Sequence, residues 1–195
     1  MTLIWFREGL QQWIGAGCTA RPFVCDGSPL ACRAFIVGFN AATAMPRPFW
    51  HYWDDAAGFR RELFAADYAA LGKRKGNRRV IEILSDSLLP CLETNLYPTP
   101  TPRARGLADE DRKTDLFEFL FDTIRPRLVF AHSKPVLVWF RERTGLDAID
   151  ETPRETSWRG HAFRLAGRSG PLYTMSSEDA GELGGALAAA PGPGS

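Results

Sequence analysis

RAFIVGF, residues 33–39, is a compact apolar run rich in β-branched and aromatic side chains, and it decides the fold class that we expect. Such a run predicts a strand that is buried on both faces, as the central strands of parallel sheets are. Two further runs, CLETNLY at 91–97 and RLVFAH at 127–132, predict two more strands. Residues 161–165 and 171–175 are short strand candidates.

Amphipathic helices are predicted between and around these strands. Their apolar periodicity indicates helices over 3–17, 56–71, 77–89, 111–124, 135–144 and 177–190. Residues 18–32 contain Gly, Pro, Cys and Asp, which indicates a loop. Ser176 is the expected N-cap of the last helix, with Asp179 in its first turn. Strands that alternate with helices pair in parallel, so we expect an α/β protein, a three-layer αβα domain with a central, mainly parallel four-stranded sheet. We expect residues 1–190 to form this single domain and residues 191–195 to form a flexible tail.

The charge balance limits the kind of partner. The 195 residues carry 24 Lys and Arg against 23 Asp and Glu, a formal net charge of +1. This excludes a polybasic protein that coats nucleic acid, but not a local basic face. No apolar run approaches the roughly 18 residues of a membrane span, and Arg7 and Glu8 interrupt the apolar start of the chain. A cytoplasmic monomer without membrane contact is therefore expected.

Common metal and cofactor motifs are missing from the sequence. The cysteines, Cys18, Cys25, Cys32 and Cys91, form no CxxC pair, which favours buried thiols over a zinc or iron–sulfur site. Walker A, GxGxxG, GxSxG and HExxH patterns do not occur, so nucleoside triphosphate chemistry, dinucleotide redox chemistry and zinc proteolysis have no support. We expect no metal and no cofactor.

Polar residues accompany the ends of the three main predicted strands. Asn40 follows Gly38 at the end of the first strand, and Asn95 lies within the second. His132 ends the third strand and Ser133 follows it. Ligands of parallel α/β sheets bind beyond the carboxyl ends of the strands, so these residues are candidates for one site.

Each of these polar residues also has a purely structural interpretation. Asn40 can close an Asx-turn, and Asn95 can pair with nearby backbone instead of a ligand. Ser133 can cap the helix that begins at Pro135. A hydrolase that uses Ser133 as its nucleophile is a less favoured hypothesis, because adjacency to His132 does not by itself make a catalytic triad.

An aromatic segment and a basic run lie between the first two strands. Residues 49–53 (FWHYW) are dense in rings for a loop, and such rings either stack on a nucleobase or pack against the neighbouring helix. The run 73–79 is either a solvated face or a phosphate-contacting patch. Its five cationic residues are Lys73, Arg74, Lys75, Arg78 and Arg79.

The order of these segments resembles the uracil-DNA glycosylase superfamily. The resemblance is carried by FIVGFNAATAMP at 35–46, PFW at 48–50, LETNLYPTP at 92–100 and PRLVFAHSKP at 126–135. It implies an α/β fold that holds a flipped uracil of DNA and hydrolyses its N-glycosidic bond. It also implies a base-excision repair function.

The resemblance implies roles for individual residues. Gly38, Phe39 and Asn40 occupy the strand-end motif, in which the Asn positions the attacking water. Phe49 or Trp50 takes the place of the ring that stacks on the base.

The second strand carries the residue that the family uses to read the base. There Asn95 takes the place of the Asn that hydrogen-bonds the uracil edge. Ser133 lies in the turn that follows the third strand, next to His132.

Two departures from the family pattern bear on activity. Ala41 stands where the family has a proline, and Met175, Ser176 and Ser177 stand where it has His-Pro-Ser or Asn-Pro-Ser and a wedge loop. The donor that stabilises the leaving base is thus absent from its usual place, and His132 is the alternative donor. Two hypotheses follow: a glycosylase with full, weakened or lost activity, and a noncatalytic nucleobase- or nucleic-acid-binding module. The net charge near zero predicts few phosphate contacts.

Overall fold

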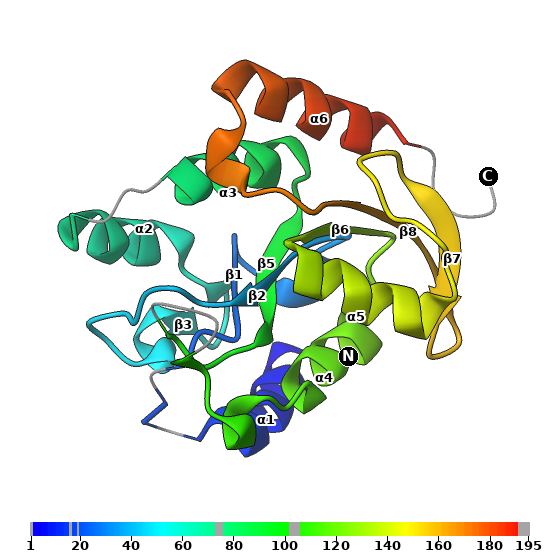
Figure 1. Ribbon diagram of the computed structural model, residues 1–195. Coiled ribbons are helices and arrows are strands. Elements are labelled where there is room, and N and C mark those ends of the chain that lie inside the picture. Colours follow the sequence, from blue (N-terminus) through cyan, green and yellow to red (C-terminus); the bar gives the residue numbers. More distant parts are fainter. Residues whose placement is uncertain (1, 16, 19, 73–75, 102–105, 191–195) are drawn as a thin grey trace.

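The computed structural model describes residues 2–15, 17–18, 20–72, 76–101 and 106–190. Within these ranges it is an α/β fold with a six-stranded, mostly parallel sheet and six α-helices (Figure 1). The strands of this sheet are β1 (Phe23–Cys25), β2 (Ala34–Asn40), β5 (Cys91–Tyr97), β6 (Leu128–His132), β7 (Arg154–Trp158) and β8 (His161–Arg168). The helices are α1 (Leu3–Ile14), α2 (Arg61–Ala70), α3 (Gly76–Ser87), α4 (Asp115–Ile124), α5 (Lys134–Thr144) and α6 (Ser177–Ala189).

Four parallel strands form the centre of the sheet, in the order β5-β2-β6-β8. β1 and β7 add one antiparallel strand at each edge. The predicted parallel centre is confirmed, but the predicted total of four strands is wrong for the described sheet. β1 spans 3 residues in a segment expected to be a loop. β7 has the largely exposed sequence RETSW, so neither edge strand carries the long apolar run of a central strand.

Two segments adopt a different structure from the one predicted. Segment 56–71, expected to be helical throughout, begins within a small antiparallel hairpin of β3 (Trp53–Asp54) and β4 (Gly58–Phe59). Segment 171–175, a strand candidate, forms a short 3-10 helix instead. Pro171 precedes that turn and lacks the N–H that a strand ladder uses.

The predicted N-cap of the last helix is confirmed. The Ser176 hydroxyl accepts a hydrogen bond from the Asp179 backbone N–H at 3.0 Å. The Asp179 carboxylate in turn accepts one from the Ser176 N–H at 3.2 Å. This reciprocal pair satisfies two donors that the start of α6 would otherwise leave free.

Helices pack on both faces of the sheet and bury two hydrophobic clusters. α3 and α6 cover one face, where Ile36 and Phe130 are buried (Figure 1). α1, α4 and α5 cover the other, where Val37 and Val129 are buried. Successive side chains of a strand point to opposite faces. The even-numbered residues of β2 and β6, and the odd-numbered residues of β5, therefore face α3.

In the described part of the chain, no helix is both long enough and apolar enough to cross a bilayer.

Candidate functional site

Five polar or glycine residues near the carboxyl ends of β2, β5 and β6 lie on the sheet face that α3 covers. All of them except Glu93 were predicted as site residues. Strand alternation places Gly38 and Asn40 of β2, Glu93 and Asn95 of β5, and His132 of β6 on this face. The apolar cluster below them ends at these residues. The sheet thus presents a polar edge to the α3 side at its carboxyl end.

Gly38 allows two of these side chains to converge. It pairs with Asn95 in the β2–β5 ladder. A Cβ at Gly38 would lie 2.6 Å from Oδ1 of Asn95 and 2.8 Å from Nε2 of His132. Asn95 and His132 therefore lean over the glycine from the two neighbouring strands, into space that any other residue would fill.

A cavity of about 90 Å³ lies above this polar edge. Its floor includes Asn40, Glu93, Asn95 and His132, and its walls come from the loop after β2, from α2 and α3, and from the segment before β1. The wall residues are Arg21, Ala42, Thr43, Tyr68, Asn77, Arg78 and Ile81, together with Thr94. The volume equals that of about three water molecules, so the cavity has room for a small polar group.

The Asn95 side chain is buried without a protein partner. It is 8% exposed, it lines the cavity, and its amide makes no hydrogen bond to any described residue. By contrast, the hydroxyl of neighbouring Thr94 donates to the Pro22 carbonyl at 2.6 Å. The nitrogen and oxygen of this amide are not among the fully buried side-chain atoms that lack a partner. Both are therefore accessible in the cavity and can bind a water or a ligand.

The Asn40 amide is held in place by the loop that follows β5. Its Nδ2 donates to Oγ1 of Thr101 at 2.6 Å and to the Thr101 carbonyl at 3.1 Å. These contacts replace the Asx-turn that was the structural interpretation of Asn40. Since Nδ2 is occupied, the oxygen Oδ1 is the atom left to accept a hydrogen bond from a water or a ligand.

His132 is neutral at physiological pH. Burial lowers its pKa to about 4, and the nearby negative charge of Glu93 only partly opposes this shift. A neutral imidazole has one N–H donor and one acceptor nitrogen. His132 makes no hydrogen bond to any described residue, so both remain for a group in the cavity.

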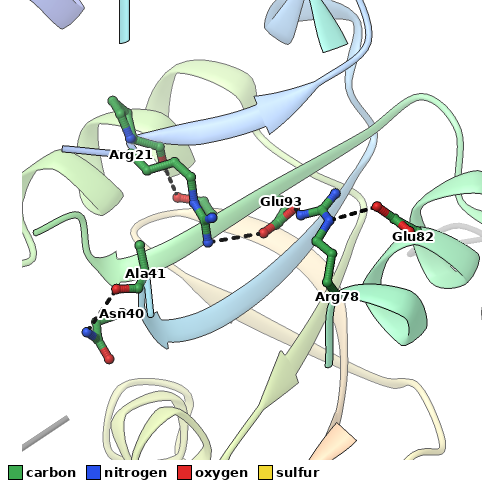
Figure 2. A network of polar contacts seen from close by, with 8 residues as sticks. Arg21, Asn40, Ala41, Arg78, Glu82 and Glu93 are labelled. Atoms are coloured by element: carbon green, nitrogen blue, oxygen red, sulfur yellow. Dashed lines mark hydrogen bonds and ion pairs between the residues drawn. The ribbon is translucent and has the colours of Figure 1, made fainter. Parts of the chain in front are cut away.

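A buried chain of charges forms part of the cavity floor and wall. Figure 2 shows the Glu93 carboxylate between the guanidinium groups of Arg21 and Arg78. Arg21 lies 3.5 Å from Glu93, and Arg78 pairs with both Glu93 and Glu82. Burial raises the pKa of Glu93, but the charges of Arg78 and Arg21 outweigh burial, so the pKa lies below its ordinary value. Glu93 is therefore a carboxylate inside the protein.

Of the five cations in the basic run, only Arg78 and Arg79 lie within the described residues. Arg78 is 6% exposed and is occupied by its two carboxylates, so it is a wall of the cavity rather than a surface cation. Arg79 is exposed and donates to the Met175 carbonyl at 2.7 Å. Lys73, Arg74 and Lys75 lie outside the described residues.

The aromatic residues predicted to stack on a base do not line the cavity. Phe49 is 3% exposed and packs against Phe23 and Phe59, and Trp50 donates to the Gly15 carbonyl at 2.6 Å. Phe49 thus packs against strand residues of the core, whereas Tyr52 of the same segment packs against Phe64 of α2, the neighbouring helix of the alternative interpretation.

A different ring faces the cavity. Phe39 points to the opposite face from Gly38, where it meets Tyr97 edge to face at 4.9 Å. The cavity ring is Tyr68 of α2, whose centroid lies 5.6 Å from the Arg78 guanidinium carbon.

Ser133 has neither of its proposed roles. It stands at the N-cap position of α5 with φ of 86°, but its side chain makes no capping hydrogen bond. Its hydroxyl is buried without a hydrogen-bond partner, His132 included. The capping interpretation is therefore wrong, and the contacts of Ser133 give no support to a serine nucleophile.

The position of the family's second motif is filled by structural residues. Met175 is 4% exposed in the core beneath α3 and α6. Ser176 caps α6, as described above. Neither residue lines the cavity, so His132 remains the imidazole at the site.

The described residues offer no site for a metal ion. No group of three or more His, Cys, Asp or Glu side chains among them is arranged to hold one. All of the cysteines are free thiols, and Cys25, Cys32 and Cys91 are buried, as their spacing predicts.

Sequence reasoning missed the charged part of the site. Glu93 could have been found, because it lies two residues before Asn95 and thus on the same face of β5. Arg21 and Tyr68 come from segments predicted as a loop and as the apolar stripe of a helix. Only the packed structure brings them to the cavity.

No protein-family model matches the chain, and a search of curated proteins finds no match either.

Proposed function

We propose that this chain is a uracil-DNA glycosylase-like repair protein with the three-layer αβα arrangement of that superfamily. Its reaction is hydrolysis of the N-glycosidic bond of a flipped uracil or related deaminated base. The observation that carries the proposal is the buried Asn95 amide, which has no protein partner and shares one cavity with Asn40 and His132.

The chemistry of uracil fits these groups. The pairing edge of uracil has an N–H donor beside a carbonyl acceptor, and an amide offers the complementary acceptor and donor. Asn95 would read this edge, and the ring of Tyr68 gives the base a flat neighbour. Gly38 leaves the room in which the Asn95 and His132 side chains come together to meet the base.

The reaction needs a positioned water and a stabilised leaving group. In the proposed step the water oxygen bonds to C1′ of the sugar while the C1′–N1 bond breaks and its electron pair leaves with the base. Oδ1 of Asn40 accepts a hydrogen bond from this water, whose proton passes to solvent. The neutral imidazole of His132 donates to the base oxygen on which negative charge develops.

A noncatalytic base-binding module is the second candidate. Met175 and Ser176 fill the place of the second catalytic motif with a core and a cap residue. Such a module would use Asn95 and Tyr68 in the same way, without a water positioned by Asn40 and without a leaving base stabilised by His132.

Uracil excision from single-stranded and U·G oligonucleotides tests the proposal. We expect abasic sites with the natural chain and a loss on the order of 100-fold in Asn40→Ala, whose base binding persists. Asn95→Leu removes both binding and excision. Because Asn95 has no protein partner, this variant keeps the free energy of unfolding of the natural chain. Gln11→Ala, an exposed amide on α1, is the matched control.

The outcomes separate the two candidates. Binding of uracil-containing DNA that depends on Asn95, with no excision by the natural chain, selects the noncatalytic module. Absence of both binding and excision, or equal activity in Asn95→Leu, contradicts both.

A further inference from the structure

A second and larger cavity lies at the opposite end of the parallel strands. Its volume is about 240 Å³, and it is lined by the first residues of β2 and β6, Ala34 and Leu128. Three arginines, Arg33, Arg127 and Arg164, line the same cavity. It shares no lining residue with the candidate site described above.

The three arginines lie just before β2, just before β6 and within β8, the strand next to β6. The Arg127 N–H donates to the Arg33 carbonyl at 2.8 Å, and the Arg164 N–H donates to the Arg127 carbonyl at 2.8 Å. Arg164 pairs in register with Leu128, so its side chain leaves the sheet on the α3 face. Arg33 and Arg127 are neighbours at one register position earlier, and the repulsion between these two like charges is relieved by an anion.

One of these three arginines forms an ion pair with a carboxylate of the described chain. Glu155 pairs with Arg164 at 3.1 Å. Arg33 and Arg127 have no ion pair or side-chain hydrogen bond to any described residue. The Nε of Arg164 is buried without a hydrogen-bond partner. The cavity therefore holds more guanidinium donors than the protein around it uses.

The guanidinium groups of these arginines do not donate to the carbonyls at the nearby helix ends. α3 ends at Ser87 and α6 at Ala189, and residues at both ends line the cavity. Helix C-terminal carbonyls carry partial negative charge and commonly accept from arginine. Here none of the three guanidinium groups donates to a carbonyl of either helix end. Their donors remain directed to the cavity or to solvent.

The remaining wall is apolar. Leu88, Leu89, Leu128 and Leu187 line the cavity with the arginines. The planar guanidinium group matches the two oxygens of a carboxylate or phosphate. The volume equals that of about eight water molecules, which is enough for a small organic molecule. We infer that this cavity binds a small organic oxyanion, a phosphate or carboxylate that carries a short apolar group.

Calorimetric titration of the full chain with phenyl phosphate, benzoate and inorganic phosphate tests this site. We expect binding of phenyl phosphate or benzoate to weaken about tenfold or more in the double variant Arg33→Gln/Arg127→Gln. Arg141→Gln, an exposed arginine on α5, leaves it unchanged. Leu89→Ala weakens binding of the aromatic anions and not of inorganic phosphate, because the Leu89 side chain forms apolar wall.

Three results would overturn the inference. They are absence of binding of all three anions at millimolar concentration, equal binding by the double variant, and arginine-dependent binding of a single-stranded oligonucleotide alone. Both arginines are exposed, so the double variant is expected to fold, and its circular dichroism spectrum checks this. Uracil excision by the double variant separates the two sites, because this inference predicts no change in it.

Discussion

The two ends of the parallel strands carry arginines in opposite electrostatic settings. At the carboxyl end, Arg21 and Arg78 are buried against Glu93, and the ligand-facing groups are the neutral Asn95 and His132. At the amino end, three arginines meet one glutamate around a larger cavity. Paired charges shape a site for a neutral polar ligand, whereas unpaired charges make a site for an anion. Cavity size alone does not distinguish these two functions.

The largest effect is expected from the buried carboxylate of the carboxyl end. Glu93→Gln leaves Arg21 and Arg78 buried without their shared counter-charge, which costs about 3–5 kcal/mol of the free energy of unfolding. Urea denaturation measures this loss. Glu155→Gln is the control from the amino end. The ion pair of Glu155 with Arg164 contributes no more than about 1 kcal/mol to the free energy of unfolding. A similar loss of stability in both variants would contradict the predicted difference between the two ends of the sheet.

Acid stability tests the neutral state of His132. Its pKa is about 4 in the folded protein, below the ordinary value of 6.5. The unfolded chain therefore takes up a proton first as the pH falls, so stability is complete above pH 6.5 and declines towards pH 4. The decline attributable to His132 is roughly 3 kcal/mol. Denaturation midpoints across this range measure it.

The matched variant is His132→Gln, which removes the titrating group. Its midpoints should lose this part of the pH dependence. The decline due to Glu93 begins lower, because its pKa lies below 4.5. An unchanged pH profile in His132→Gln would contradict the assignment.

Gly38→Ala tests the convergence of Asn95 and His132. The added methyl group meets the ends of both side chains and displaces them, at a cost of about 1–2 kcal/mol in stability. Base binding falls much more than stability does, because both recognition groups move. Fluorescence titration with a uracil-containing oligonucleotide measures the binding. Gly106→Ala, where a Cβ meets no neighbour, is expected to change neither quantity.

The smallest effect is expected at the amino end. Arg127→Gln removes the positive charge next to Arg33 and raises the free energy of unfolding by a few tenths of a kcal/mol at low salt. The gain disappears at high ionic strength, where exposed charges are screened. A loss of stability in low-salt thermal denaturation would show that Arg127 has a stabilising partner.

The centre of the fold was largely predictable from the sequence. Segment 91–97 matches β5, and segments 33–39 and 127–132 match β2 and β6 to within one residue at each end. Strands buried on both faces leave a continuous apolar signal. The edge strands β1 and β7 leave none, because one is very short and the other is mostly exposed.

The site was predictable only where it depends on strand position. Asn40, Asn95 and His132 line one cavity because they lie at or near the carboxyl ends of neighbouring parallel strands. The rings predicted to stack do not line this cavity, because the apolar surface of Phe49 is buried in the core. Tyr68 reaches the cavity through helix packing, which one sequence pattern does not encode.

The Arg21–Glu93–Arg78 chain also links order at the site to cooperative folding. Arg21 and Glu93 are 72 positions apart in the sequence, and Arg78 comes from a third segment, so a partly folded chain cannot assemble their contacts. Burial of Glu93 becomes favourable only when both partners arrive. The floor of the site should therefore open only with global unfolding, and amide hydrogens of β5 near Glu93 should exchange at that slow limit.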